Sequence, residues 1–184
     1  MARTRLGDPL QQVWLDVGAG IGLMDEHVQP AVGRLVGLDI SEEMTSRAAE
    51  RNPSVEYLVS RSQTFPLEDA TFDVAFASCV LHHVPRDERA HLVAEMARVI
   101  RPGGLVIVLE HNPFNPATRL VVARCEFDED AVLLRMRETR ELLSDAGLEE
   151  RERAYILFLP WRNTIERRLS RLPLGAQYYV ASSA

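Results

Sequence analysis

Two apolar segments, one running into a glycine-rich turn and the other ending in an acid, limit most strongly how this chain can fold. Residues 13–22 read V-W-L-D-V-G-A-G-I-G, and Asp39 ends the second segment in V-G-L-D-I-S. Glycines after an apolar strand let bare backbone approach a ligand, and an acid about 20 residues further on is placed for ribose hydroxyls. The two segments together predict a nucleoside-type cofactor at one edge of a sheet.

The spacing of the glycines separates two kinds of cofactor. A nicotinamide-dinucleotide fingerprint reads G-x-G-x-x-G, and Leu23 stands here at the position of its third glycine. The glycines instead alternate as Gly18, Gly20 and Gly22, and Asp16 lies within the end of the preceding strand. Taken alone, the glycines are also compatible with an ordinary tight turn between a strand and a helix.

The composition favours one globular domain, residues 1–184, with 46% apolar and 26% charged residues. The formal net charge of −6 does not favour nucleic acid as a partner. Cys79 and Cys125 are too few for a disulfide scaffold or a zinc site. The N-terminus has no apolar core for a signal peptide, and the apolar run Leu105–Leu109 is too short to span a membrane. We therefore expect a cytoplasmic protein without a membrane partner.

Strand-like and helix-like segments alternate, which predicts an α/β fold with a mostly parallel sheet. The expected strands are residues 13–17, 35–39, 55–59, 72–77, 105–109, 155–159 and 178–180. The expected helices run from the glycine turn to about Ala31, from a Ser41 N-cap to before Pro53, and over residues 87–100, 139–146 and 162–172. The last two strands lie close together in the sequence, which suits an antiparallel strand at one edge.

Three ordered segments resemble motifs of one enzyme family. The string D-x-G-x-G-x-G at residues 16–22 resembles motif I of the class I S-adenosylmethionine-dependent methyltransferases. The segment F-P-L-E-D-A-T-F-D through L-H-H at residues 65–83 resembles the surroundings of strand four in bacterial small-molecule members, those with a methyltransferase domain 11-like sequence. R-V-I-R-P-G-G-L-V-I-V at residues 98–108 resembles the helix, turn and strand that follow. The resemblance implies a three-layer Rossmann-like sandwich with a seven-stranded sheet.

The resemblance also implies S-adenosylmethionine as the cofactor. Its expected contacts are Asp16, Gly18, Ala19, Gly20, Asp39, Ile40, Met44, Ser62, Gln63 and Ser78. In this assignment Asp39 takes the ribose hydroxyls, and Ser62 and Gln63 lie at the adenine. Met44 is equally compatible with a position in the core. Arg61 departs from the family pattern, which often has an acid there, and this puts the adenine contact in doubt.

His83, Glu110 and His111 are the candidate catalytic residues. A histidine could accept a proton from a hydroxyl nucleophile, and His83 is alternatively a residue that caps or packs the loop after strand four. Glu110 and His111 follow strand five, where the methyl acceptor is expected, as a base or substrate ligand or as residues that brace the loop. Two prolines are expected to stiffen residues 110–119 as a loop. The adjacent His-His pair alone makes no metal site, so no metal is expected.

Only twelve residues precede the first strand, whereas members of the family usually begin with helices that cover the cofactor. We therefore expect a lid that is short or missing, and a site completed by a second copy in a homodimer or by residues 111–130. Three functions remain open: methyl transfer to a small molecule, with oxygen as the expected acceptor atom, a non-catalytic binding or interaction module, and a nicotinamide oxidoreductase. Leu23 and the later motifs disfavour the last of these. The sequence does not identify the acceptor.

Overall fold

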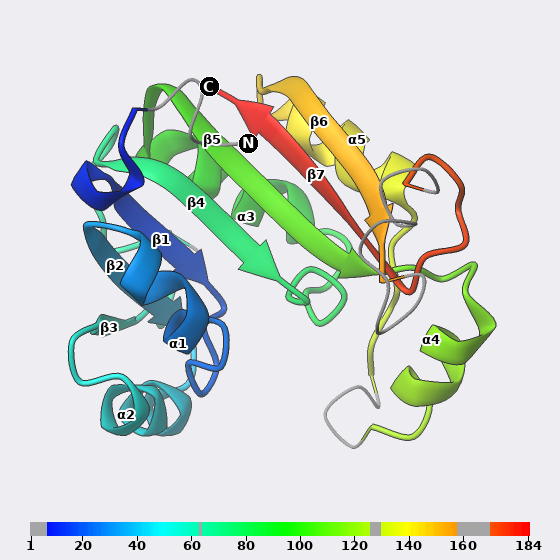
Figure 1. Cartoon of the computed structure of the whole chain (residues 1–184), viewed down its shortest axis with the longest axis horizontal. Helices are drawn as coiled ribbons and strands as arrows, with labels where there is room; N and C mark the ends of the chain where they lie inside the picture. The colour runs from blue at the N-terminus through cyan, green and yellow to red at the C-terminus, as the bar shows by residue number, and fades with distance from the viewer. Residues whose placement is uncertain (1–6, 63, 126–129, 158–169) are drawn as a thin grey trace.

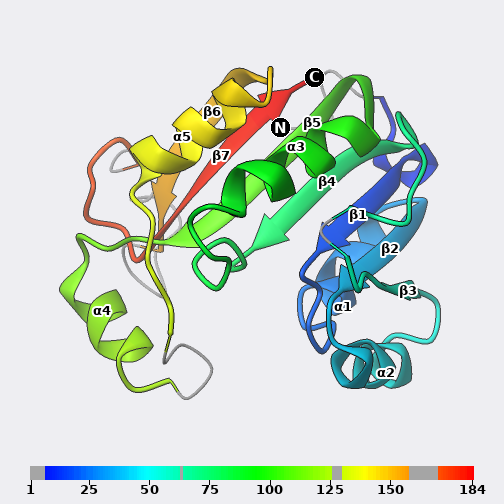
Figure 2. The ribbon, with the colours of Figure 1, turned by 180° about the vertical axis from the view of Figure 1, so that it is seen from behind.

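The computed structural model describes residues 7–62, 64–125, 130–157 and 170–184. They form a seven-stranded sheet in the order β3-β2-β1-β4-β5-β7-β6, with helices on both faces (Figures 1 and 2). The strands are β1 (Val13–Val17), β2 (Arg34–Asp39), β3 (Glu56–Val59), β4 (Phe72–Ser78), β5 (Ile100–His111), β6 (Glu149–Ile156) and β7 (Gln177–Ser183). The α-helices are α1 (Asp25–Val28), α2 (Glu42–Arg51), α3 (Arg89–Val99), α4 (Pro116–Val122) and α5 (Met136–Asp145).

The predicted three-layer, mostly parallel arrangement is confirmed. Strands β1 to β5 pair in parallel, and β7 pairs antiparallel with both β5 and β6. The antiparallel strand therefore lies second from the edge, between β5 and β6. A crossover through α5 returns the chain to β6, and β7 then fills the remaining position in the sheet (Figure 2).

Apolar side chains on both faces of the central strands build two cores. The larger core lies between the sheet and helices α3 and α5, and includes the fully buried Met96 and Leu143. The smaller core lies on the opposite face, where Val28 of α1 packs against Leu35 and Phe76. Because β4 is buried from Phe72 to Ala77, it is apolar on both faces apart from Asp73 rather than alternating.

The helix predicted after Ser41 is confirmed, including its cap. The Ser41 hydroxyl accepts a hydrogen bond from the Met44 amide at 3.3 Å, and Glu42 and Glu43 lie in the first turn of α2. The helix predicted to run to Ala31 was wrong at its end, because α1 stops at Val28 and a short 3-10 helix that contains a proline follows it. The helix expected at 162–172 falls mostly on residues 158–169, outside the described part of the chain.

The segment after β5 was wrongly predicted to be a loop throughout. Its second proline, Pro116, begins helix α4 at a position where no backbone N–H is needed. Asn115 caps this helix, since its Oδ1 accepts from the Thr118 amide at 3.0 Å. Side-chain hydrogen bonds from Asn112, Asn115 and Thr118 tie α4 and the preceding loop to residues 173–176, which are distant in the sequence. Pro116 is therefore the first residue of a helix and not part of a loop.

Two strands begin earlier than predicted. β5 starts at Ile100, directly after α3, so the Pro-Gly-Gly sequence lies inside the strand rather than before it. A Cβ on Gly104 would lie 2.5 Å from the Ile100 side chain, so the strand passes this point only because the residue is glycine. β6 starts at Glu149 rather than Tyr155, because an edge strand can carry alternating charged residues toward solvent.

The carboxyl ends of β1 to β5 all lie at one edge of the sheet, since these strands are parallel. This is the edge where open α/β sheets bind ligands. It carries the glycine turn, Asp39, Ser78 and the segment that begins with Glu110. None of the helices in the described ranges has the length and apolar character to cross a membrane.

Candidate functional site

The glycine turn after β1 presents open backbone at the carboxyl edge. Gly18 and Gly20 have φ values of +75° and +54°, a conformation that favours glycine. The Gly18 amide donates to the carbonyl of Leu38 at 2.7 Å, so the turn is fixed to β2. A Cβ on Gly20 would meet nothing within 4 Å, whereas one on Gly18 would lie 2.5 Å from Val80. One face of the turn is therefore free to receive a ligand, and the other packs against the loop after β4.

Asp39 links the end of β2 to this turn. Its Oδ2 accepts from the Gly20 amide at 2.8 Å, and its Oδ1 accepts from the Ser41 amide at 2.9 Å. A carboxylate oxygen has a second lone pair, so both oxygens could still accept from ligand hydroxyls. The neighbouring Ile40 is 82% exposed, and Met44 is half-buried one turn into α2. The predicted ribose carboxylate thus lies beside the glycine turn with apolar side chains near it.

Asp16 and Asp25 form a buried pair of carboxyl groups beneath the turn. They are 2% and 0% exposed, and Oδ1 of each receives no hydrogen bond. Burial raises the pKa of Asp16 well above its usual range, and the negative charges of Asp25 and Asp39 raise it further. An unpartnered, buried carboxyl oxygen beside a ligand edge fits a positively charged group, so this pair could hold the ammonium or sulfonium end of the cofactor that the sequence implies.

The predicted adenine side of the site is only partly described. Ser62 is exposed, and its hydroxyl donates to the carbonyl of Thr64 at 2.6 Å. Gln63 lies outside the described residues. Arg61 pairs with Glu42 at 2.6 Å on the surface, with both side chains more than 70% exposed. The arginine that departs from the family pattern therefore points toward the first turn of α2.

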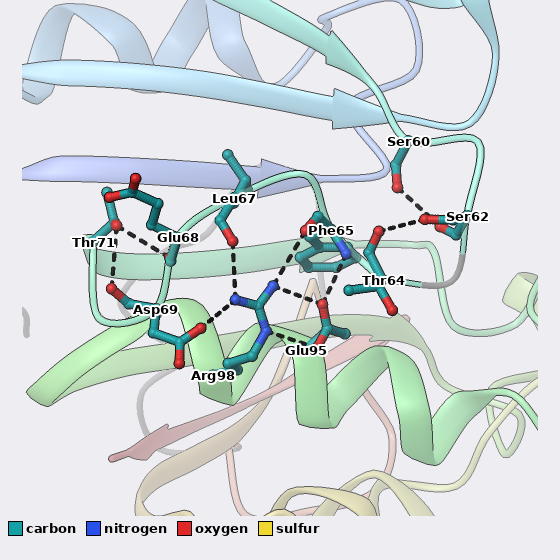
Figure 3. Close-up of polar contacts among 10 residues, drawn as sticks. All are labelled: Ser60, Ser62, Thr64, Phe65, Leu67, Glu68, Asp69, Thr71, Glu95 and Arg98. Atoms are coloured by element: carbon teal, nitrogen blue, oxygen red, sulfur yellow. Dashed lines mark hydrogen bonds and ion pairs between the residues drawn. The ribbon is translucent and has the colours of Figure 1, made fainter.

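A buried network holds the segment that follows Ser62 against α3. Arg98 contacts both oxygens of Glu95 at 2.8 Å and donates to the carbonyls of Leu67 and Phe65 (Figure 3). Oε2 of Glu95 also accepts from the Phe65 amide at 2.8 Å. The hydrogen bonds from Arg98 lower the pKa of Glu95, so its carboxylate is held in the charged form. Because the segment leads from β3 toward β4, α3 fixes its path.

Glu110 pairs with His82, which was not among the predicted site residues. Its Oε2 lies 2.6 Å from Nδ1 of His82, and its Oε1 accepts from the Leu81 amide at 2.7 Å. The side chains of Glu110 and His82 are 0% and 1% exposed. The carboxylate therefore has the Leu81 amide and the His82 imidazole as hydrogen-bonding partners. The arrangement fastens the loop after β4 to the end of β5.

His83 and His111 flank this buried pair. The ring centroids of His83 and His111 lie 4.1 Å and 5.2 Å from that of His82. His83 is exposed and His111 is half-buried, so both residues reach the surface at the carboxyl edge of the sheet. Among the described residues, no group of three or more histidine, cysteine or acidic side chains is placed to hold a metal ion.

Ser78 is the last residue of β4, and Cys79 directly follows it at the carboxyl edge of the sheet. Both are half-buried, and Cys79 has a φ of +59°, an uncommon conformation for a residue other than glycine. Gln177, the first residue of β7, donates from Nε2 to Sγ of Cys79 at 3.3 Å. Gln177 was missed from the sequence because the antiparallel pairing that brings it opposite His111 spans a long separation.

The comparisons with known proteins agree with this geometry. The family described as "Methyltransferase domain" matches residues 15–108. The chain is 36% identical over 110 residues to the demethylmenaquinone methyltransferase of Renibacterium salmoninarum, covering 59% of this chain and 45% of that protein. It is 29% identical over 170 residues to the ubiquinone biosynthesis O-methyltransferase of Rhizobium etli, covering 85% and 67% of the two proteins.

The fold has close relatives among solved structures. An S-adenosylmethionine-dependent methyltransferase from Mesorhizobium loti superposes with a TM-score of 0.71 at 19% identity, covering 99% of this chain and 95% of that one. The chain spans less than half the length of the first curated relatives it matches. The family match covers more than half of the sequence and includes the glycine turn, Asp39 and β4. The chain therefore belongs to the methyltransferase domain family, of the S-adenosylmethionine-dependent type.

Proposed function

We propose that this chain transfers a methyl group from S-adenosylmethionine to an oxygen atom of a small-molecule acceptor. The observation that carries the proposal is the joint position of the open glycine turn, Asp39 and two accessible histidines at one edge of the sheet. When bound, the cofactor supplies an electrophilic methyl carbon and a sulfur atom that leaves uncharged. The remaining task of the protein is to hold the two reactants in line at about 3–3.5 Å.

The cofactor would lie across the ends of β1, β2 and β4. The backbone of Gly18, Ala19 and Gly20 would contact its methionine part, with Asp16 beneath. Asp39 would accept from the ribose hydroxyls, since its oxygens already accept from backbone amides and keep their orientation. Apolar contact with the adenine would come from Ile40 and Met44, and polar contact from Ser62 and Gln63. Ser78 would lie beside the transferable methyl group.

His111 is the residue we propose as general base for an acceptor hydroxyl, with His83 as a second ligand of the acceptor. A hydroxyl must lose its proton during the transfer, and an imidazole nitrogen is the commonest general base for that step. Glu110 is proposed as a positioning residue, because both its oxygens are occupied by Leu81 and His82. It would act on the site by fixing the loop that carries His83.

Two features support an oxygen acceptor. A base is needed for a hydroxyl but not for a thiol or free amine that is already unprotonated, and accessible imidazoles stand at the acceptor side. The Rhizobium etli relative, which covers most of this chain, is itself named as an O-methyltransferase. We therefore propose a small organic hydroxyl compound as the acceptor.

Transfer of a radioactive methyl group from labelled S-adenosylmethionine to a panel of phenols, catechols, hydroxy acids, amines and thiols tests the proposal. We expect transfer to at least one hydroxyl compound. His111→Gln should lower kcat by about 10²–10⁴-fold and leave cofactor binding unchanged. His91→Gln on the exposed surface of α3 is the matched control and should behave as the original protein.

The outcome also separates the proposal from its main alternative. If S-adenosylhomocysteine binds but no methyl group reaches any acceptor, the chain acts as a cofactor-binding module instead. If transfer occurs only to amines or thiols, the choice of oxygen is wrong while the methyl-transfer activity stands.

A further inference from the structure

Asp16 and Asp25 form a buried pair of carboxyl groups beneath the glycine turn. The stability of the fold alone does not require two acids at this place. Asp16 comes from β1 and Asp25 from the first turn of α1, and neither side chain is more than 2% exposed. Burying even one ionised carboxylate without compensation is costly, and two adjacent ones repel each other. The pair therefore needs a proton, a cation or both.

The hydrogen bonds around the pair leave one oxygen of each carboxyl group without a partner. The Tyr57 hydroxyl donates to Oδ2 of Asp25 at 2.7 Å, and Asn52 donates to Tyr57 at 3.0 Å and to the Gly22 carbonyl at 2.9 Å. Oδ1 of Asp16 and Oδ1 of Asp25 receive nothing. The two carboxyl groups are close enough to hydrogen-bond to each other, which requires a proton on one of them.

Among the described residues, the charged groups that act on Asp16 are both negative. Asp25 and Asp39 are the charged groups that act on Asp16, and Tyr57 faces the pair from β3. Arg51 of α2 lies 3.6 Å from Glu26 at the surface, and so serves a different acid. The three aspartates surround the turn that the cofactor is proposed to contact, and the cofactor carries a sulfonium and an ammonium group.

We infer that Asp25 is a further residue of the cofactor site, and that Asp16 and Asp25 hold one proton between them until the positively charged cofactor displaces it. The proton leaves to solvent, and the cationic group of the cofactor takes over the compensation of the second carboxylate. This inference rests on the cofactor site of the proposed function. Tyr57 and Asn52 hold Asp25 in place and connect the pair to Gly22 of the turn.

The direction of the pH dependence follows from the proton count. The free protein holds one more proton than the complex, so cofactor affinity rises with pH until the pair is ionised in the free protein as well. The slope is at most about tenfold per pH unit for a single proton. Above that range the affinity no longer changes through this pair.

Calorimetric titration of the whole chain with S-adenosylhomocysteine, and with S-adenosylmethionine, measures the proton directly. Each titration is made at several pH values in two buffers of different ionisation enthalpy, because the difference in heat gives the number of protons released. We expect release of up to one proton and a parallel rise in affinity. Release with both ligands assigns the ammonium group as the displacing cation, and release with S-adenosylmethionine alone assigns the sulfonium.

Asp25→Asn removes the second acid and offers an amide N–H to Asp16. Proton release should fall to near zero, and the affinity should no longer change over the same pH range. Asp87→Asn, a change of an exposed acid, is the matched control and should release protons as the original chain does. Circular dichroism checks that each variant folds, and the two-buffer measurement on the unmodified chain decides the matter even if Asp25→Asn does not.

Binding without proton release at every pH would overturn this inference and leave the proposed function intact. Full proton release by Asp25→Asn would overturn the role of Asp25. Absence of binding by both ligands would instead overturn the proposed cofactor site, and this inference with it.

Discussion

At the scale of single residues, the site depends on carboxylates whose partners were hidden in the sequence. Glu110 was a candidate base, and its two oxygens are bound to His82 and the Leu81 amide in the interior. Asp25 lies beside Asp16, and the glycine turn separates the two residues in the chain. In both cases the role of the carboxylate follows from its contacts in the structure and could not be inferred from the sequence motif.

Glu110→Gln tests the positioning role. The amide keeps the shape but loses the charge-assisted bond to His82, so we expect a loss of about 1–3 kcal/mol in the free energy of unfolding. Methyl transfer should show a lower kcat with an unchanged affinity for S-adenosylhomocysteine. Urea denaturation and steady-state kinetics measure the two effects. Glu43→Gln, a carboxylate in an exposed pair with Arg47, should change neither.

An unchanged stability in Glu110→Gln would contradict the buried pair. A rise in KM for the acceptor with no change in kcat would mean that Glu110 contacts the acceptor itself.

Asp16 gives the free energy of unfolding a defined pH dependence. Burial raises its pKa above the value of about 3.9 expected in the unfolded chain. Between those two pKa values the folded protein binds more protons, so this residue's contribution to stability falls as pH rises from about 4 through the raised pKa. Asp16→Asn should remove that fall. Urea denaturation across pH measures the free energy of unfolding of both proteins. The original chain should lose stability relative to Asp16→Asn as pH rises, and a difference that does not change with pH would contradict this prediction.

At the scale of elements, helix α3 holds the segment after β3 largely through Arg98, together with Glu95. Arg98 contacts Glu95, Asp69 and the carbonyls of Leu67 and Phe65 (Figure 3). Glu95 is only 7% exposed, so it depends on this partner for its charge. The predicted amphipathic helix is thus also the anchor for the segment that leads into β4.

Arg98→Ala should therefore be far more harmful than a typical surface change. It removes both hydrogen bonds from Arg98 to the Glu95 carboxylate and those to the carbonyls of Leu67 and Phe65, and we expect a loss of about 2–3 kcal/mol. Thermal unfolding followed by circular dichroism measures it. Arg98→Lys should recover part of the loss, and Arg47→Ala, whose side chain is 61% exposed, should cost less than 1 kcal/mol. Equal effects of Arg98→Ala and Arg47→Ala would contradict the assigned role.

Elements defined by local signals could be predicted, and those defined by distant contacts could not. The glycine turn, the Ser41 cap and the apolar strands β1, β2 and β4 depend on neighbouring residues, and they lie where expected. Helix α4 depends on hydrogen bonds to residues 173–176, and β6 is charged because it is an edge strand. Neither feature has a hydrophobic period that a sequence could reveal.

The same division applies to the candidate site. Asp16, Gly18, Gly20 and Asp39 stand in a compact motif, and they meet at one place in the structure. The pairing of His82 with Glu110 joins residues 28 positions apart, one in the loop after β4 and one in β5. Such a pairing follows from sheet order, which the sequence indicates only in outline.

At the scale of the whole molecule, the carboxyl edge of the sheet has two halves that carry chemically different residues. The ends of β1 and β2 carry backbone amides and carboxylates, which suit a cationic nucleoside cofactor. The ends of β4 and β5 and the start of β7 carry imidazoles, a thiol and an amide, which suit a polar acceptor. The strand order places β4 next to β1, so the two halves are neighbours. This adjacency is what makes methyl transfer between them geometrically reasonable.

Calorimetric binding of S-adenosylhomocysteine to the whole chain and to Asp39→Asn tests the central claim most directly. We predict one site per chain, no binding of NAD under the same conditions, and a loss of about 10–150-fold in affinity for Asp39→Asn, which corresponds to a hydrogen bond to a charged group. Thermal unfolding verifies that the variant is folded. Binding of NAD but not of S-adenosylhomocysteine, or an affinity that Asp39→Asn leaves unchanged, would contradict the assignment of the glycine turn and Asp39 as the cofactor site.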